Sequence, residues 1–109
     1  MSVMVIACYR PKRGKDDELL ALVKNHLPIL RGEGLVGDGP SLCGRATDGV
    51  LVEIFCWKSQ DAIAGAHENP VVAKMWAAFG EVCEYTTIGK VEGAHDLFTP
   101  LASVDLSEV

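Results

Sequence analysis

Two histidines and one carboxylate are the residues of this chain best suited to proton transfer. His67 lies in a stretch with helical spacing, next to Ala66 on the apolar stripe. The ordinary pKa of an imidazole, about 6.5, suits a general base near neutral pH. His26 lies on the apolar stripe of an earlier helical stretch and can face the same pocket. Glu53 is the one charge in an otherwise apolar run, where burial raises the pKa of a carboxyl and makes it a base. We rank His67 first.

Each of these residues also has a purely structural explanation. His67 can end a helical segment, half exposed, at the negative end of the helix dipole. His26 can be a core histidine with one satisfied hydrogen bond. Glu53 can form a cross-strand pair with Arg45, depending on the turn between their strands. A two-residue turn places Arg45 opposite Val52, whereas a three-residue turn places it beside Glu53, and the sequence leaves both registers open.

Aromatic residues are spread over the segments that carry these groups. We expect several of them to line a cavity: Tyr9, Phe55, Trp57, Trp76, Phe79 and Tyr85. Such walls favour a flat, aromatic ligand through offset stacking. Taken singly, each is better explained as part of a hydrophobic core, as the ordinary i,i+3 spacing of Trp76 and Phe79 illustrates. The two tyrosines stand out because a buried hydroxyl needs a partner, which a substrate can supply.

Several function classes are disfavoured by composition and motif content. The four cysteines (Cys8, Cys43, Cys56 and Cys83) lack zinc-site spacing, and no Gly-rich phosphate loop, nucleophile elbow or His-Glu metal motif occurs. We therefore expect neither a metal nor a cofactor. The net charge of −5 argues against a nucleic-acid partner. The longest apolar run, Val3–Tyr9, is too short for a membrane span and lacks the basic flank of a signal peptide. These features predict a cytoplasmic protein without a membrane partner.

Hydrophobic patterning predicts the order strand, helix, strand, strand, helix, strand. The expected strands cover residues 3–10, 41–47, 50–57 and 83–91, and the helices begin near Asp16 and near Gln60. The second helix is expected to restart at Asn69-Pro70, with Asn as cap. Asp48-Gly49 suits a tight hairpin turn of the primed type. This order predicts an α+β protein with a ferredoxin-like βαββαβ fold, an antiparallel sheet and both helices on one face.

One layer of helices leaves the second face of this sheet without cover. The runs at 3–10 and 50–57 are apolar at positions belonging to both faces. A second copy of the chain is the simplest cover, so we expect a homodimer. Residues 1–91 are expected to form the domain, and residues 92–109 a C-terminal tail that packs on the domain or on the partner subunit.

A family resemblance rests on the segment Val52-Glu-Ile-Phe-Cys-Trp-Lys-Ser59 and on the residues that follow it. With Ala62-Ile63, Ala66-His67 and Pro70, this segment resembles the antibiotic-biosynthesis-monooxygenase-like family of dimeric α+β barrels. The resemblance implies two sheets packed face to face in a homodimer, with one pocket per subunit between sheet and helices. Members of the family carry out cofactor-independent oxygenation of phenolic polyketides, haem degradation or isomerisation, so the fold alone selects none of these.

The haem-degrading branch is disfavoured. Its first-strand Asn falls at Tyr9, its Trp falls at His67, and its His falls near Trp76, so one residue is absent and two are interchanged. Because Tyr9 takes the place of a polar pocket residue, we rank it above Tyr85.

The combined expectation is a cofactor-independent monooxygenase acting on a small aromatic or quinol-like substrate. A phenol deprotonated by His67 can reduce dioxygen directly, because the anion is electron-rich. The expected catalytic residues are His67, Tyr9 and Glu53, and the expected substrate-binding residues are Trp76, Tyr85, His26, Phe55 and Phe79. Two alternatives remain: a non-catalytic ligand-binding or stress-responsive dimer, and an isomerase or lyase with the same pocket.

Overall fold

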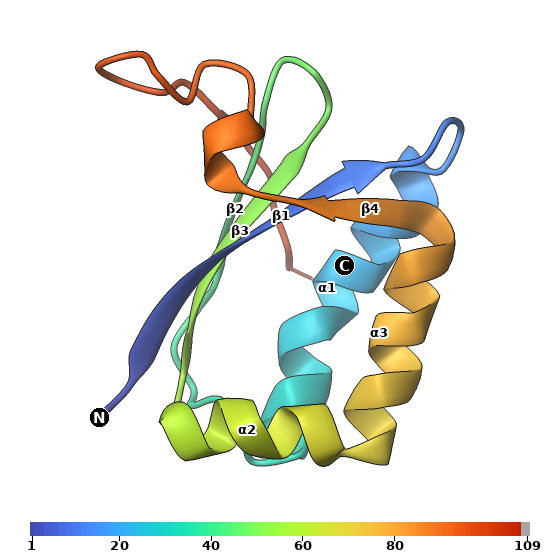
Figure 1. Ribbon diagram of the computed structural model, residues 1–109, viewed down its shortest axis with the longest axis vertical. Helices are drawn as coiled ribbons and strands as arrows, with labels where there is room; N and C mark the ends of the chain where they lie inside the picture. Colours follow the sequence, from blue (N-terminus) through green and yellow to red (C-terminus); the bar gives the residue numbers. More distant parts are fainter. Residues whose placement is uncertain (108–109) are drawn as a thin grey trace.

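A five-stranded antiparallel sheet with three helices on one face makes up the fold, in a computed structural model that describes residues 1–107 (Figure 1). The strands are β1 (Val3–Pro11), β2 (Leu42–Arg45), β3 (Leu51–Trp57), β4 (Cys83–Thr86) and β5 (Ala102–Ser103). The helices are α1 (Asp16–Gly32), α2 (Gln60–Glu68) and α3 (Pro70–Val82), and a short 3₁₀ helix, η1, covers Ile88–Lys90. The strand order across the sheet is β4-β1-β3-β2-β5. The α+β class is therefore confirmed, and the arrangement is compatible with a ferredoxin-like fold.

The helices begin where the sequence predicts them. Three acidic residues occupy the first turn of α1, next to the positive end of its dipole. Between α2 and α3, the Asn69 side chain accepts hydrogen bonds from the backbone N–H groups of Val71 and Val72, and Pro70 follows in the first turn. The predicted restart at Asn69-Pro70 is confirmed. It turns α3 away from α2, so that α3 packs beside α1 (Figure 1).

The hairpin between β2 and β3 differs from the tight turn predicted. The Ala46 N–H donates to the Val50 carbonyl, so the loop holds three residues, Thr47 to Gly49. Gly49 has φ +91°, but no non-glycine residue among those described has a positive φ, as a primed Asp-Gly turn would require at Asp48. A glycine in the left-handed region at the end of a three-residue loop is the usual alternative.

The chain after α3 also differs from the prediction. The expected strand over residues 83–91 ends at Thr86, because the backbone turns into η1 and brings Val91 into a buried cluster with Cys8 and Val52. The segment expected as an irregular tail contains β5, which pairs with β2. Gly44 permits this pairing: a Cβ there would lie 2.7 Å from the Leu101 Cβ.

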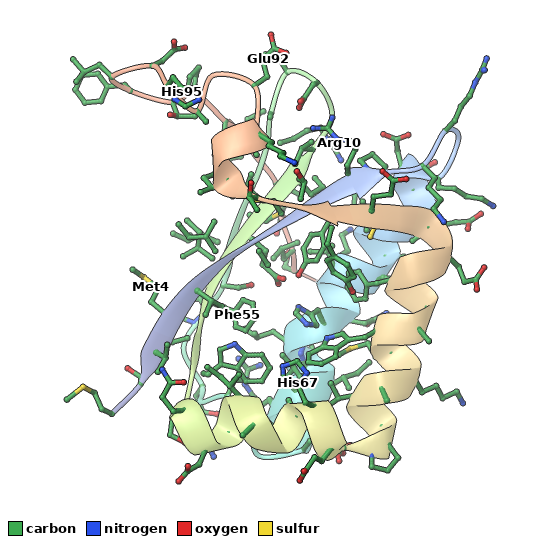
Figure 2. The ribbon with its side chains drawn as sticks, in the orientation of Figure 1. Met4, Arg10, Phe55, His67, Glu92 and His95 are labelled. Carbon is green, nitrogen blue, oxygen red and sulfur yellow. The ribbon has the colours of Figure 1, made fainter. Side chains whose placement is uncertain are left out.

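The two faces of the sheet have different cover. We call the face that packs on the helices the inner face and the opposite one the outer face. One end of the outer face is buried by the chain's own Val91, Ala94 and Leu101. The other end carries large exposed side chains, among them Leu42 and Met4. Met4 is labelled in Figure 2. No helix within residues 1–107 combines the length and apolar character needed to cross a membrane.

Candidate functional site

A cavity of about 470 Å³ lies between the inner face of the sheet and the helices. It is lined by Val5, Ala7, Tyr9, His26, Phe55, Trp57, Ile63, His67, Trp76, Phe79 and Tyr85. In Figure 2, Phe55 projects from β3 toward the helices, and His67 projects from α2 into the same space. The lining is mainly apolar and aromatic, and it contains no Lys, Arg, Asp or Glu.

Three polar side chains meet at the inner face in a buried cluster. The Tyr9 hydroxyl donates to Oε1 of Glu53 at 2.8 Å. Nδ1 of His26 lies 2.8 Å from the same oxygen. All three residues are buried, with Glu53 at 0% exposure. Tyr9 and His26 line the cavity, whereas Glu53 lies behind them. We call these residues the Tyr9–Glu53–His26 cluster.

Antiparallel pairing and the α1 stripe bring the cluster together. In the β1–β3 register, Ala7 faces Glu53 and Tyr9 faces Leu51, so Tyr9 and Glu53 are diagonal neighbours on the inner face. His26 is on the buried side of α1, between Val23 and Leu30. The three residues are far apart in the sequence, and their types alone do not indicate that they meet.

The buried carboxylate affects the titration of its neighbours. Burial, followed by the negative charge of Glu53 and the hydrogen bond to it, raises the pKa of Tyr9 far above its ordinary value of 10.0. Tyr9 therefore stays a neutral hydrogen-bond donor near neutral pH. Burial and the Glu53 charge also raise the pKa of the Cys43 thiol to about 11. Cys43 lies opposite Glu53 across the β2–β3 pair.

His26 lines the cavity, and its second ring nitrogen, Nε2, is not used in the contact with Glu53. Nε2 has no hydrogen-bond partner within residues 1–107, and it is not fully buried. Glu53 Oε2, by contrast, is fully buried and has no partner within the same residues. The imidazole packs edge-on against Phe55 and Phe79, with both ring centroids at 5.3 Å. Its orientation is thus determined by Glu53 on one side and by aromatic rings on the others.

His67 has a different environment. It lies in the last turn of α2 and is exposed to solvent. Its ring centroid is 5.2 Å from that of Trp76, at an angle of 59° between the planes. It has no side-chain hydrogen bond to the other described residues. His67 therefore borders the cavity at its solvent-exposed edge.

Seven of the eight predicted site residues line this one cavity, and the eighth, Glu53, contacts two of them. The proposed pair of Glu53 with Arg45 does not form: Arg45 faces Leu51 across the hairpin. Three further lining residues, Val5, Ala7 and Ile63, are not predicted from the sequence. The alternation of β1 places Val5 and Ala7 on the face of Tyr9, and that signal could have identified them.

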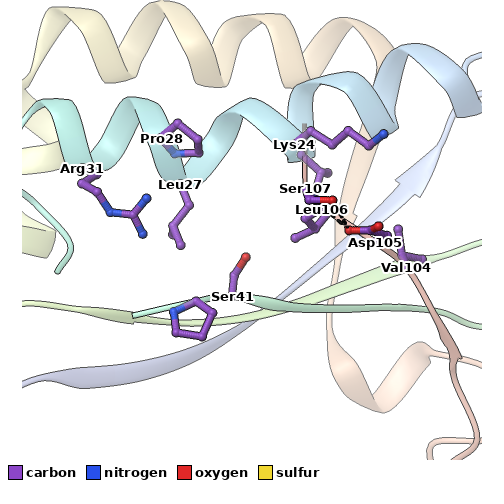
Figure 3. Close-up of a pocket in the computed structure, with 11 residues that line it drawn as sticks. Lys24, Leu27, Pro28, Arg31, Ser41, Val104, Asp105, Leu106 and Ser107 are labelled. Atoms are coloured by element: carbon purple, nitrogen blue, oxygen red, sulfur yellow. Dashed lines mark hydrogen bonds between the residues drawn. The ribbon is translucent and has the colours of Figure 1, made fainter. Parts of the chain in front are cut away.

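A second hollow, of about 360 Å³, lies between α1 and the C-terminal segment (Figure 3). Lys24, Arg31 and Asp105 border it, and Asp105 accepts hydrogen bonds from the Ser107 backbone N–H and hydroxyl at 2.8 and 2.6 Å. These bonds lower the pKa of the Asp105 carboxyl. The hollow has no aromatic wall, and the Arg31 guanidinium at its edge already donates to the carbonyls of Gly37 and Gly39. It is a weaker candidate than the aromatic cavity.

No group of three or more potential metal-ligating His, Cys, Asp or Glu side chains occurs in residues 1–107. The chain was also compared with protein-family models, with curated proteins and with solved structures, and none of the three comparisons gave a match. The family resemblance therefore stays a prediction, and the candidate site is argued from its own geometry.

Proposed function

We propose that this protein is a cofactor-independent monooxygenase that acts on a small phenolic or quinol-like substrate in the aromatic cavity. One observation carries the proposal: a largely apolar cavity, large enough for a small aromatic molecule, holds a buried imidazole with one ring nitrogen free. Apolar walls that position a few polar groups are typical of small-molecule sites. An imidazole in such a site can act as a general base near neutral pH.

The lining favours an uncharged aromatic substrate. The cavity walls lack a cation that would bind a carboxylate or phosphate, and they lack a carboxylate that would bind an amine. Rings are continuous along the wall: Tyr9 lies 5.1 Å from Phe79, and Phe55 lies 5.5 Å from Trp57, between ring centroids. A flat aromatic ring gains stacking from these walls without leaving a buried charge unpaired.

The proposed reaction balances without an external reductant. The base takes the phenolic proton, and the electron-rich phenolate reacts with dioxygen at a ring carbon that carries hydrogen, forming a carbon–oxygen bond. The protonated base returns its proton to the resulting peroxide anion. Cleavage of the O–O bond, with loss of the proton on that carbon, then gives a quinone and one water. Each phenol supplies four electrons and consumes one dioxygen.

We propose further that the working unit is a homodimer of ferredoxin-like subunits, with the exposed part of the outer faces packed together. Met4 faces Cys56, and Ile6 faces Ile54, across β1 and β3. Leu42 extends this row of side chains onto β2. The row is apolar and uncharged, so a twofold copy can bury it against itself without leaving a charge unpaired. The resemblance to the dimeric α+β barrels supports the same arrangement.

Oxygen consumption with a panel of phenols, naphthols and quinols tests the activity. We expect uptake of one dioxygen per substrate and formation of a quinone by the wild-type protein. The double variant His26→Gln/His67→Gln should lose this activity, because both imidazoles of the cavity are removed. The control is His95→Gln, which replaces the remaining histidine, an exposed residue outside the cavity.

Two results would contradict this function. Saturable binding of the panel without any turnover would favour a non-catalytic ligand-binding protein. Conversion of a substrate without oxygen uptake would favour an isomerase or lyase, which needs the same base but no oxidant.

A further inference from the structure

We propose that His26 is the base of this site and that Glu53 is its positioning residue, holding the imidazole so that Nε2 is the unprotonated nitrogen facing the substrate. The inference rests on the proposed function for its chemistry, and on the Tyr9–Glu53–His26 cluster for its geometry. It differs from the sequence-based expectation, which ranked His67 first.

The first step is the tautomer of His26. Glu53 Oε1 accepts the Tyr9 hydroxyl proton and so carries none itself, and the contact of 2.8 Å between this oxygen and His26 Nδ1 therefore requires a proton on Nδ1. A neutral imidazole carries one ring proton, and Nε2 is then left with its lone pair. Nε2 has no hydrogen-bond partner in the described part of the chain. This atom is not fully buried, even though His26 as a whole is only 3% exposed. The cavity that His26 lines provides this access.

The second step is the charge that forms on proton transfer. When Nε2 takes the phenolic proton, the imidazolium lies beside Glu53, with the hydrogen-bonded atoms at 2.8 Å. In a buried site such a pair is screened far less than at the surface, so the carboxylate stabilises the cation that the reaction creates. Tyr9 donates to the same carboxylate oxygen and so holds Glu53 in place. His26, Glu53 and Tyr9 then form a chain of contacts from the cavity to the buried carboxylate.

The third step is the contrast with His67. Among residues 1–107, no carboxylate lies at hydrogen-bond distance from His67, which is exposed in the last turn of α2. Nothing selects one of its tautomers, and water screens its charge. Its contact with Trp76 suits a residue that borders the entrance of the cavity.

Nitrogen-15 NMR of the histidine side chains in the wild-type protein tests the positioning role directly. We expect neutral His26 to be protonated at Nδ1, and His67 to show the averaged signals of an unrestrained imidazole. In Glu53→Gln, the His26 signals should move toward the Nε2-protonated form or an average of the two. The matched control is Glu84→Gln, at an exposed position of β4, which should leave the His26 signals unchanged.

Steady-state kinetics of oxygen uptake test the catalytic role. His26→Gln should lower kcat by about 100-fold or more, the usual contribution of a general base, whereas the control His95→Gln, at an exposed position outside the cavity, should keep kcat within about threefold of wild type. Glu53→Gln should lower kcat by about 100-fold with KM nearly unchanged, because Glu53 does not line the cavity. Loss of binding contacts alone would instead raise KM.

Two outcomes overturn the inference. One is a neutral His26 protonated at Nε2 in the wild-type protein, a measurement that needs no variant to fold. The other is an active His26→Gln together with an inactive His67→Gln. If the wild-type protein consumes no oxygen, the proposed function fails, but the NMR measurement still decides whether Glu53 positions His26.

Discussion

The two faces of the sheet reverse the usual distribution of polar and apolar side chains. On the inner face, the carboxylate of Glu53 is 0% exposed, and its Oε1 contacts the Tyr9 hydroxyl and His26 Nδ1. On the outer face of the same strands, Met4 is 69% and Leu42 68% exposed. Neighbouring residues of β3 belong to opposite faces, so these environments differ by a single step along the chain.

Neither the buried carboxylate of the inner face nor the exposed apolar row of the outer face makes a single chain more stable. Burying a carboxylate costs free energy, and an apolar residue at the same position would avoid that cost. Large apolar side chains that stay exposed do not contribute the favourable free energy of burial. A polar cluster beside a cavity suits chemistry, and an apolar row suits an interface. Changes to each face therefore test a different proposal.

The largest effect is expected at the inner face. Glu53→Ala leaves Tyr9 and His26 without their buried partner and opens a cavity behind them. We expect a loss of about 3–5 kcal/mol in the free energy of unfolding, the range typical of breaking a buried pair. Urea denaturation followed by circular dichroism measures it. Glu84→Ala, an exposed strand position, should change stability by about 0.5 kcal/mol or less. Equal costs for the two variants would show that Glu53 is not held in the cluster.

The next effect is expected on the exposed part of the outer face. Ile6→Lys places a charge in the middle of the apolar row, and we expect it to weaken dimerisation by about 2 kcal/mol or more. Sedimentation equilibrium measures the dissociation constant. The control is Lys74→Ala, on an exposed position of α3 away from the sheet. A wild-type chain that sediments as a monomer would contradict the proposed dimer outright.

A smaller effect is expected at the covered end of the outer face. Gly44→Ala brings a Cβ to 2.7 Å from the Leu101 Cβ, so the C-terminal segment must shift. We expect a loss of about 1–3 kcal/mol in stability, as for overpacking, together with faster hydrogen exchange at the Val104 N–H, which donates to the Cys43 carbonyl. Gly65→Ala, on α2 with open space around it, is the control and should not destabilise the fold. Unchanged exchange at Val104 in Gly44→Ala would show that the segment does not pack there.

The smallest effect at neutral pH concerns the two tyrosines of the inner-face region. The pKa of each phenol is raised by burial, that of Tyr85 to about 12 and that of Tyr9 further. A folded pKa above the ordinary value of 10.0 means that stability is full below pH 10 and falls as the pH rises toward the folded values. In Tyr85→Phe, where Tyr9 is the remaining tyrosine, phenolate absorbance should therefore appear only as the chain unfolds. Reversible ionisation of Tyr9 near pH 10 in a folded chain would show that the cluster is open to water.

Local sequence patterns were sufficient to predict most of the helices and strands. The restart of a helix at Asn69-Pro70 follows from capping and proline geometry, which involve only neighbouring residues. The strand ending at Trp57 and the start of α1 at Asp16 follow from similarly local signals. Where the prediction was wrong, after Thr86, the outcome depended on distant segments, because Val91 packs against Cys8 and Val52. β5 is the clearest case, because Leu101 can approach β2 only where Gly44 has no side chain.

The candidate site, too, could be predicted from the sequence only in part. Residue types identified Tyr9, His26, Glu53 and His67 as groups able to move protons, and helical spacing placed His26 on an apolar stripe, but the sequence did not show which way Glu53 and His67 point. Spacing could not tell which groups would touch. The register of β2 on β3 places Arg45 opposite Leu51, and the packing of α1 on the sheet brings His26 to Glu53 instead.

The sequence by itself determined the α+β class, the main helices and strands, and the aromatic character of the cavity, because these depend on residue type and on periods of a few residues. The tertiary structure decided that Glu53 accepts from Tyr9 and contacts His26, that His67 stays exposed, and that the C-terminal segment covers only one end of the outer face. These outcomes depend on strand register and on the docking of α1 and of the C-terminal segment. Both are set by the packing of the whole chain rather than by any short stretch of it.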